Sequence, residues 1–72
     1  MPQGTVKYFK TDKGYGFIAP DEGGADAYIN VSELEKTGLS SLTVGQKVTF
    51  DFEPDKRPGR LRAMNVRNAQ QN

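Results

Sequence analysis

Turn-forming residues, glycine and proline foremost, divide this chain into short runs. Such breaks lie at residues 11–14, 20–24 and 54–59, in a chain that holds eight glycines and four prolines. The runs between them are rich in β-branched and aromatic side chains, which favour extended backbone. The pattern therefore predicts short strands joined by tight turns, and an all-β fold.

Five strand-length runs can be placed along the sequence, at residues 4–10, 13–18, 25–31, 46–53 and about 60–67. Side chains alternate between the two faces of a strand, so the apolar member of each alternation is expected inside. The residues predicted to be buried in these runs are Val6, Ile18, Ala27, Ile29, Val31, Val48, Phe50, Phe52, Met64 and Val66.

One helical turn is expected after the third strand. Ser32 and Glu35 have the spacing of a capping box, and Gly38 is placed to end the turn. A loop would follow, with Leu39 and Leu42 against the barrel.

Five short strands with one helical turn after the third indicate a five-stranded antiparallel Greek-key barrel, the oligonucleotide/oligosaccharide-binding fold. Closure into a barrel removes exposed strand edges that so small a chain could not cover. With 72 residues we expect one domain, residues 1–68, and a polar, frayed C-terminal tail, residues 69–72.

The composition argues against several classes of protein. The chain has no cysteine and no histidine, which excludes disulfides and the usual zinc sites. No nucleophile–base pair is evident, and Asp21, Glu22 and Asp26 are better interpreted as solvated turn acids than as a metal cluster. No apolar run approaches the length needed to span a membrane, and the N-terminus lacks the pattern of a secretory signal. We therefore expect a cytoplasmic monomer that is not an enzyme, with no cofactor, metal, membrane or small-molecule substrate.

The run Lys13–Ile18 carries two aromatic side chains on one face. Alternation places Tyr15 and Phe17 together, with Gly16 and Ile18 on the opposite face. The two rings could form a platform on which unpaired bases stack, with Lys13 at its edge near a phosphate. They could equally form half of a small core. In the third run Tyr28 is expected outside, beside Tyr15 and Phe17.

In the first run Tyr8 and Phe9 are adjacent, so an ideal strand would send them to opposite faces. Either one ring is buried, or a bulge turns both outward. Lys7 and Lys10 flank the two rings, which is the alternation of basic and aromatic residues expected of a nucleic-acid surface.

Charge is unevenly distributed although the net charge is only +1. Residues 21–35 contain five acids and no basic residue, whereas residues 56–72 contain five basic residues and no acid. Among the latter, Arg57, Arg60 and Arg62 are candidates for phosphate contact and guanidinium stacking.

Several motifs resemble those of the bacterial cold shock proteins. Lys13-Gly14-Tyr15-Gly16-Phe17-Ile18 is similar to the family's K-G-F-G-F-I motif, and residues 26–32 to its D-V-F-V-H-F-S motif. Residues 4–9 resemble the family's opening G-x-V-K-W-F. The resemblance implies a five-stranded barrel that binds single-stranded RNA and single-stranded DNA with low sequence selectivity and is not enzymatic. It also favours the outward bulge for Phe9. The binding-face positions that it implies are Lys7, Tyr8, Phe9, Lys13, Tyr15, Phe17, Tyr28 and Asn30.

The chain departs from the family at several of these positions. Tyrosines stand where the family usually has Trp at position 8 and Phe at positions 15 and 28, and they can still stack. Asn30, Val31 and Leu39 replace a His and two aromatic residues, which removes stacking rings. Two hypotheses follow: an RNA chaperone that regulates transcription or translation, or a small protein-interaction barrel with a partly decayed nucleic-acid face.

Overall fold

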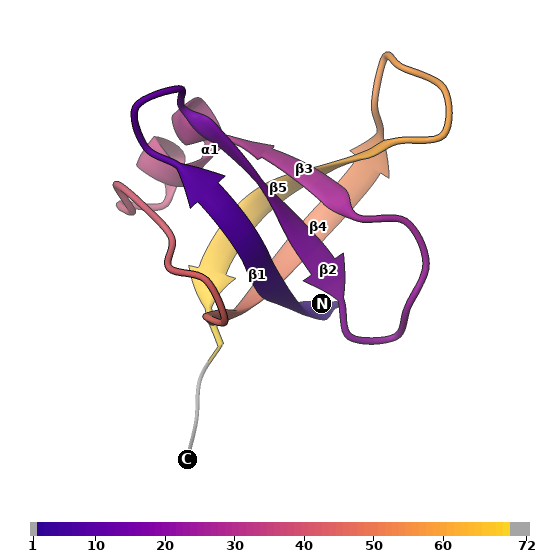
Figure 1. Ribbon diagram of the computed structural model, residues 1–72, viewed down its shortest axis with the longest axis horizontal. Helices are drawn as coiled ribbons and strands as arrows, with labels where there is room; N and C mark the ends of the chain where they lie inside the picture. Colours follow the sequence, from indigo (N-terminus) through magenta and orange to yellow (C-terminus); the bar gives the residue numbers. More distant parts are fainter. Residues whose placement is uncertain (1, 70–72) are drawn as a thin grey trace.

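Five strands close into a barrel in the computed structural model, which describes residues 2–69 (Figure 1). The elements are β1 (Gln3–Lys10), β2 (Tyr15–Pro20), β3 (Ala27–Asn30), α1 (Val31–Lys36), β4 (Lys47–Pro54) and β5 (Leu61–Asn68). Around the barrel the order is β1-β2-β3-β5-β4. The β3–β5 pair is parallel, and the other neighbouring pairs are antiparallel. The barrel and its single short helix after the third strand confirm the predicted fold.

Several strand boundaries differ from the prediction by one or two residues, and two of these differences have a local structural cause. Strand β2 begins at Tyr15, because the N–H groups of Lys13 and Gly14 both donate to the carbonyl of Lys10, at 3.1 and 2.7 Å, and close a turn. Gly14 has a positive φ of 77°, which favours glycine. Strand β3 ends at Asn30, so Val31 is not a strand residue but the first residue of α1.

The cap of α1 is Asn30 and not the predicted Ser32. The Asn30 Oδ1 accepts hydrogen bonds from the Ser32 backbone N–H at 2.9 Å and from the Ser32 hydroxyl at 3.0 Å. An N-cap residue needs extended backbone, and Asn30 has it because it is the last residue of β3. The strand therefore sets where the helix begins.

The end of α1 agrees with the prediction at Gly38. This glycine has a φ of 82°, and its N–H donates to the carbonyl of Glu35 at 3.1 Å. The next N–H, of Leu39, donates to the carbonyl of Leu34 at 2.9 Å, which completes a Schellman motif.

We expect Asn30→Ala to lower the free energy of unfolding by about 0.5–2 kcal/mol, because the first turn of α1 loses its side-chain acceptor. Ser32→Ala is the matched control, since its backbone N–H still reaches Asn30. Urea unfolding of both variants measures the costs. A larger loss for Ser32→Ala would show that the cap lies at position 32 after all.

Within residues 2–69, the core of the barrel consists of ten buried apolar residues, which are Val6, Ile18, Ala27, Ile29, Leu34, Leu42, Val48, Phe50, Ala63 and Val66. The alternation in the sequence predicted the strand members of this core, apart from Ala63. The expected positions of Leu39 and Leu42 are also confirmed, since Leu42 is buried and Leu39 packs against the core.

Three residues predicted inside are not buried. A bulge at Asn65, where φ is 52°, shifts the register between Thr49 opposite Arg67 and Asp51 opposite Met64. The extra residue resets the alternation in β5, so Ala63 is buried and Met64 is only half-buried. Phe52 is 50% exposed, because it stands at the end of the barrel, where it lines a small hollow. Val31 is half-buried at the start of the helix.

The C-terminal boundary lies at the edge of the described residues. Ala69, which the sequence assigns to a frayed tail, donates its N–H to the carbonyl of Lys47 at 3.0 Å. The rest of the predicted tail, residues 70–72, lies outside the described residues.

Candidate nucleic-acid interface

Four aromatic side chains gather on the outer surface of β1, β2 and β3, and we refer to Tyr8, Tyr15, Phe17 and Tyr28 as the aromatic face. Phe17 pairs with Tyr8 on one side and with Tyr28 on the other, so these rings form one row across three strands. Their ring centroids lie 5.5 and 5.8 Å from that of Phe17. Tyr15 lies 6.0 Å from Tyr28 with the planes at 25°. The predicted position of Tyr28 beside Tyr15 and Phe17 is confirmed.

The rings of β2 point outward because the other face of that strand is already occupied. Gly16 and Ile18 are buried, whereas Tyr15 and Phe17 alternate with them and are half-buried. Tyr8 is 36% exposed. None of these rings belongs to the buried core, so the interpretation of Tyr15 and Phe17 as half of that core is wrong.

The expected bulge in β1 exists, but it turns only one ring outward. Val6 lies opposite Ile18 and Tyr8 opposite Phe17, so Lys7 is the extra residue. Phe9 then lies opposite Gly16 and packs, half-buried, against the core. A Cβ on Gly16 would collide with the backbone carbonyl oxygen of Tyr8 and come within 2.7 Å of the Cα and the ring of Phe9, which is why glycine is needed there. The outward orientation predicted for Phe9 is corrected, and a role for it in binding stays a prediction.

Lysines border the aromatic face along β1. The Lys10 ammonium lies 5.7 Å from the centroid of Tyr8, a cation–π contact. Sequence reasoning noted Lys10 beside the rings but did not count it as a site residue. The Lys7 ammonium is 2.9 Å from Asp26, and this hydrogen bond, with the charge attraction, raises the pKa of Lys7. Both partners are well exposed, so a phosphate could replace the carboxylate at little cost. Lys13 is exposed in the turn before β2.

The loop between β4 and β5 brings arginines to the same surface, and Figure 1 shows it projecting beyond the barrel. Arg57 and Arg60 line a hollow of about 340 Å³ together with the four rings of the aromatic face. Arg60 is hydrogen-bonded to Asp55, with 2.7 Å between Nε and Oδ2. Arg62 lies beside Tyr28 across the β3–β5 pair and is bonded to Glu53, which raises the pKa of the guanidinium.

The separation of acidic and basic residues along the sequence is smaller in the folded chain, because residues from the two stretches form ion pairs with oppositely charged residues outside these stretches. The acidic stretch finds basic partners from other elements, since Asp21 pairs with Lys47 and Asp26 with Lys7. The arginines near the β4–β5 loop are also paired with carboxylates, since Arg60 pairs with Asp55 and Arg62 with Glu53. The contribution of each cation to phosphate binding therefore depends on whether its carboxylate partner can be displaced.

The three positions that lack the family's rings have structural roles here. Asn30 caps α1, and its Nδ2 also lies 3.3 Å from the Tyr28 hydroxyl. Val31 faces Gly14, where an added Cβ would lie 3.1 Å from Cγ1 of the valine. Leu39 completes the helix end and packs on the core. Each of these three residues therefore has a structural role in the fold, and the hypothesis of a partly decayed nucleic-acid face stays open.

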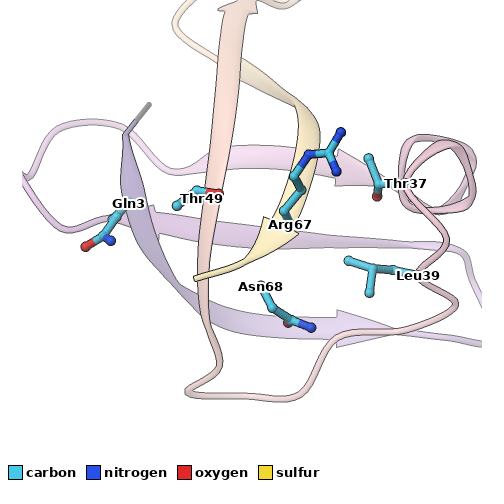
Figure 2. A pocket seen from close by; sticks show the side chains of 6 residues that line it. All are labelled: Gln3, Thr37, Leu39, Thr49, Arg67 and Asn68. Atoms are coloured by element: carbon cyan, nitrogen blue, oxygen red, sulfur yellow. The ribbon is translucent and has the colours of Figure 1, made fainter. Parts of the chain in front are cut away.

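A larger hollow of about 530 Å³ lies elsewhere on the barrel. Figure 2 shows Gln3 and Leu39 at its opposite sides, with Arg67 and Asn68 between them. Its lining holds no aromatic ring, and the side chains that surround it do not converge on one point. The smaller hollow, at the aromatic face, is the better candidate for a binding site.

Two further features are absent from residues 2–69. No group of three or more acidic side chains there is arranged to hold a metal ion. In the same part of the chain, no helix has the length and apolar character needed to cross a membrane.

Comparison with known proteins gives consistent matches over nearly the whole chain. The family described as the "Cold-shock" DNA-binding domain matches residues 2–69. Cold shock protein CspA of Rhizobium meliloti is 46% identical over 69 residues, which cover 96% of this chain and 100% of that protein. Probable cold shock protein A of Mycolicibacterium smegmatis is 45% identical over 93% of this chain and 97% of its own. A cold shock-like protein of Aquifex aeolicus is 43% identical over 90% of each chain.

Proposed function

The chain belongs to the cold-shock DNA-binding domain family, and from that premise we propose that it binds single-stranded RNA and single-stranded DNA on the aromatic face with low sequence selectivity. The row of Tyr8, Phe17 and Tyr28 across three strands is the observation that carries the proposal. Every base has a π-face, so stacking on such rings is tolerant of sequence and contributes about 1–3 kcal/mol per base.

We further propose that the protein acts as an RNA chaperone. It binds unpaired strands and not the hairpins that they form, so it shifts the equilibrium toward the unpaired state by mass action. No cofactor is consumed in this process. Where the hairpin is a terminator or masks a translation start, the same binding regulates transcription or translation.

Basic residues at the rim of the aromatic face complete the binding surface. Lys10 lies beside Tyr8, Arg57 lines the hollow, and Lys7 can exchange Asp26 for a phosphate. Each phosphate that is neutralised on a single strand adds roughly 0.7 to the negative slope of log affinity against log salt. Binding is therefore expected to combine a stacking contribution with a salt-dependent one.

We expect a short oligopyrimidine to bind with an affinity that falls as salt rises, and to shift the NMR signals of the four rings of the aromatic face. A titration at several salt concentrations measures both effects. A blunt-ended duplex of the same length is the control and should bind more weakly. Equal binding of duplex and single strand, or an affinity independent of salt, would contradict the proposal, and salt-independent capture of a protein would favour the protein-interaction barrel.

A further inference from the structure

Arg60 lies directly over one ring of the aromatic face. Its guanidinium carbon is 4.4 Å from the centroid of Tyr28, so the cation covers that side of the ring. A base cannot stack on the same side of Tyr28 without displacing the guanidinium. Arg60 is therefore either a gate that must open or a surface on which the base itself stacks.

The contacts of Asp55 hold Arg60 in place. The Arg60 Nε donates to Asp55 Oδ2 at 2.7 Å, and the Asp55 N–H donates to the Arg60 carbonyl at 2.9 Å, so both ends of the loop are joined twice. The Asp55 side chain is only 10% exposed and that of Arg60 26%. If Arg60 swung away, it would leave a mostly buried carboxylate without its cation, which is costly.

The remaining contacts of Asp55 point the same way. Burial of the carboxyl tends to raise its pKa, but hydrogen bonds from Arg60 and from the backbone N–H groups of Lys56 and Arg57 outweigh that effect and lower the pKa of Asp55. The carboxylate thus stays charged at neutral pH, and it accepts hydrogen bonds from three residues of the loop. These contacts favour a fixed arginine over a gate.

We propose that the guanidinium of Arg60, held by Asp55, is a stacking surface for one nucleobase, which it receives in place of the side of Tyr28 that it covers. A guanidinium is planar, so it can lie on Tyr28 with one side and receive a base on the other. Asp55 is then a positioning residue for nucleic-acid binding. This inference rests on the proposed function and deepens it, and it gives the face a stacking position that Asn30 and Val31 do not supply.

Arg60→Lys tests the stacking role, because lysine keeps the charge and can still pair with Asp55 but has no plane. We expect it to weaken binding of an oligopyrimidine about 5-fold or more, the lower end of the range for a lost stacked base. A series of oligonucleotides with one abasic site at successive positions locates the base concerned. For the wild type, an abasic site at one position of the oligonucleotide should weaken binding. For Arg60→Lys, an abasic site at the same position should cause no further loss of affinity.

Asp55→Asn tests the positioning role, and Asp26→Asn is its matched control. Each variant removes one negative charge from an ion pair beside the aromatic face. Electrostatics alone predicts tighter binding in both cases. We expect Asp26→Asn to tighten binding because it releases Lys7, and Asp55→Asn to weaken it because Arg60 loses its orientation. In an Arg60→Ala background Asp55→Asn should no longer weaken binding.

Three outcomes would overturn the inference. The first is that Arg60→Lys binds the oligonucleotide as tightly as the wild type does. The second is that Asp55→Asn tightens binding, as Asp26→Asn is expected to do. The third is that Arg60→Ala tightens binding, which would identify Arg60 as a gate. Thermal unfolding of each variant confirms that it folds, and Arg60→Lys keeps the ion pair and so is the safest of them. Failure of the proposed function is distinguishable, because then the wild type itself would not bind the oligonucleotide.

Discussion

Phe17→Ala is expected to weaken binding of a short oligopyrimidine by about 1–3 kcal/mol, which corresponds to about 5- to 150-fold in affinity. Phe17 is the centre of the row across β1, β2 and β3, with Tyr8 and Tyr28 as its cross-strand partners. Its removal takes away one stacking surface and leaves both neighbouring rings without their support. The stability of the barrel should change less, because the ring lies outside the buried core.

Phe52→Ala is the matched control for this experiment. It removes the same side chain from a position that is 50% exposed and lies away from the aromatic face, at the end of the barrel. Titration by NMR or calorimetry measures the affinity of both variants, and thermal unfolding measures their stability. If Phe17→Ala bound normally but lost most of its thermal stability, the ring would be structural and the aromatic face would not be the binding surface.

Phe50→Ala is expected to lower the free energy of unfolding by about 3–5 kcal/mol. Phe50 is fully buried and is the largest such side chain in the described part of the chain. The truncation loses the apolar surface of the ring and leaves a cavity that the closed barrel cannot fill by collapse. The free energy of unfolding of a native domain is only about 5–15 kcal/mol, so this one substitution is expected to remove a large part of it.

The same Phe52→Ala variant provides the comparison for stability. Phe50 and Phe52 are on the same strand with one residue between them, and their ring centroids are 6.3 Å apart. Half of the Phe52 side chain is already in contact with water, so its removal should cost clearly less than the removal of Phe50. Urea unfolding gives both values. Equal losses would mean that the end of the barrel is as tightly packed as its centre.

Much of the fold could be predicted from local patterns. Gly14, Gly38 and the break at residues 20–24 mark turns because few other residues accept the backbone that those turns need. Alternation then assigned Val6, Ile18 and Phe50 to the interior. These properties belong to single strands and turns, so neighbouring residues are enough to determine them.

The position of Arg60 could not be predicted in this way. The sequence indicates a basic loop, and phosphate contact and stacking were both open for its arginines. Only the tertiary structure places Arg60 over Tyr28, because that ring comes from β3 and the two strands β3 and β5 meet where the barrel closes. The same closure separates Phe52, at the barrel end, from Phe50 at its centre, although both follow the same alternation.

The sequence by itself determined the approximate strands, the turns and most of the core, and it placed Tyr15 and Phe17 on one face of β2 without deciding whether that face was buried. The tertiary structure decided which residues of β1 and β5 face inward after the bulges at Lys7 and Asn65. These bulges set the orientation of Phe9 and Met64. It also moved the helix cap to Asn30, the last residue of β3. The physical reason is that alternation repeats every two residues within one strand, whereas a bulge depends on how that strand must bend to stay paired with its neighbours.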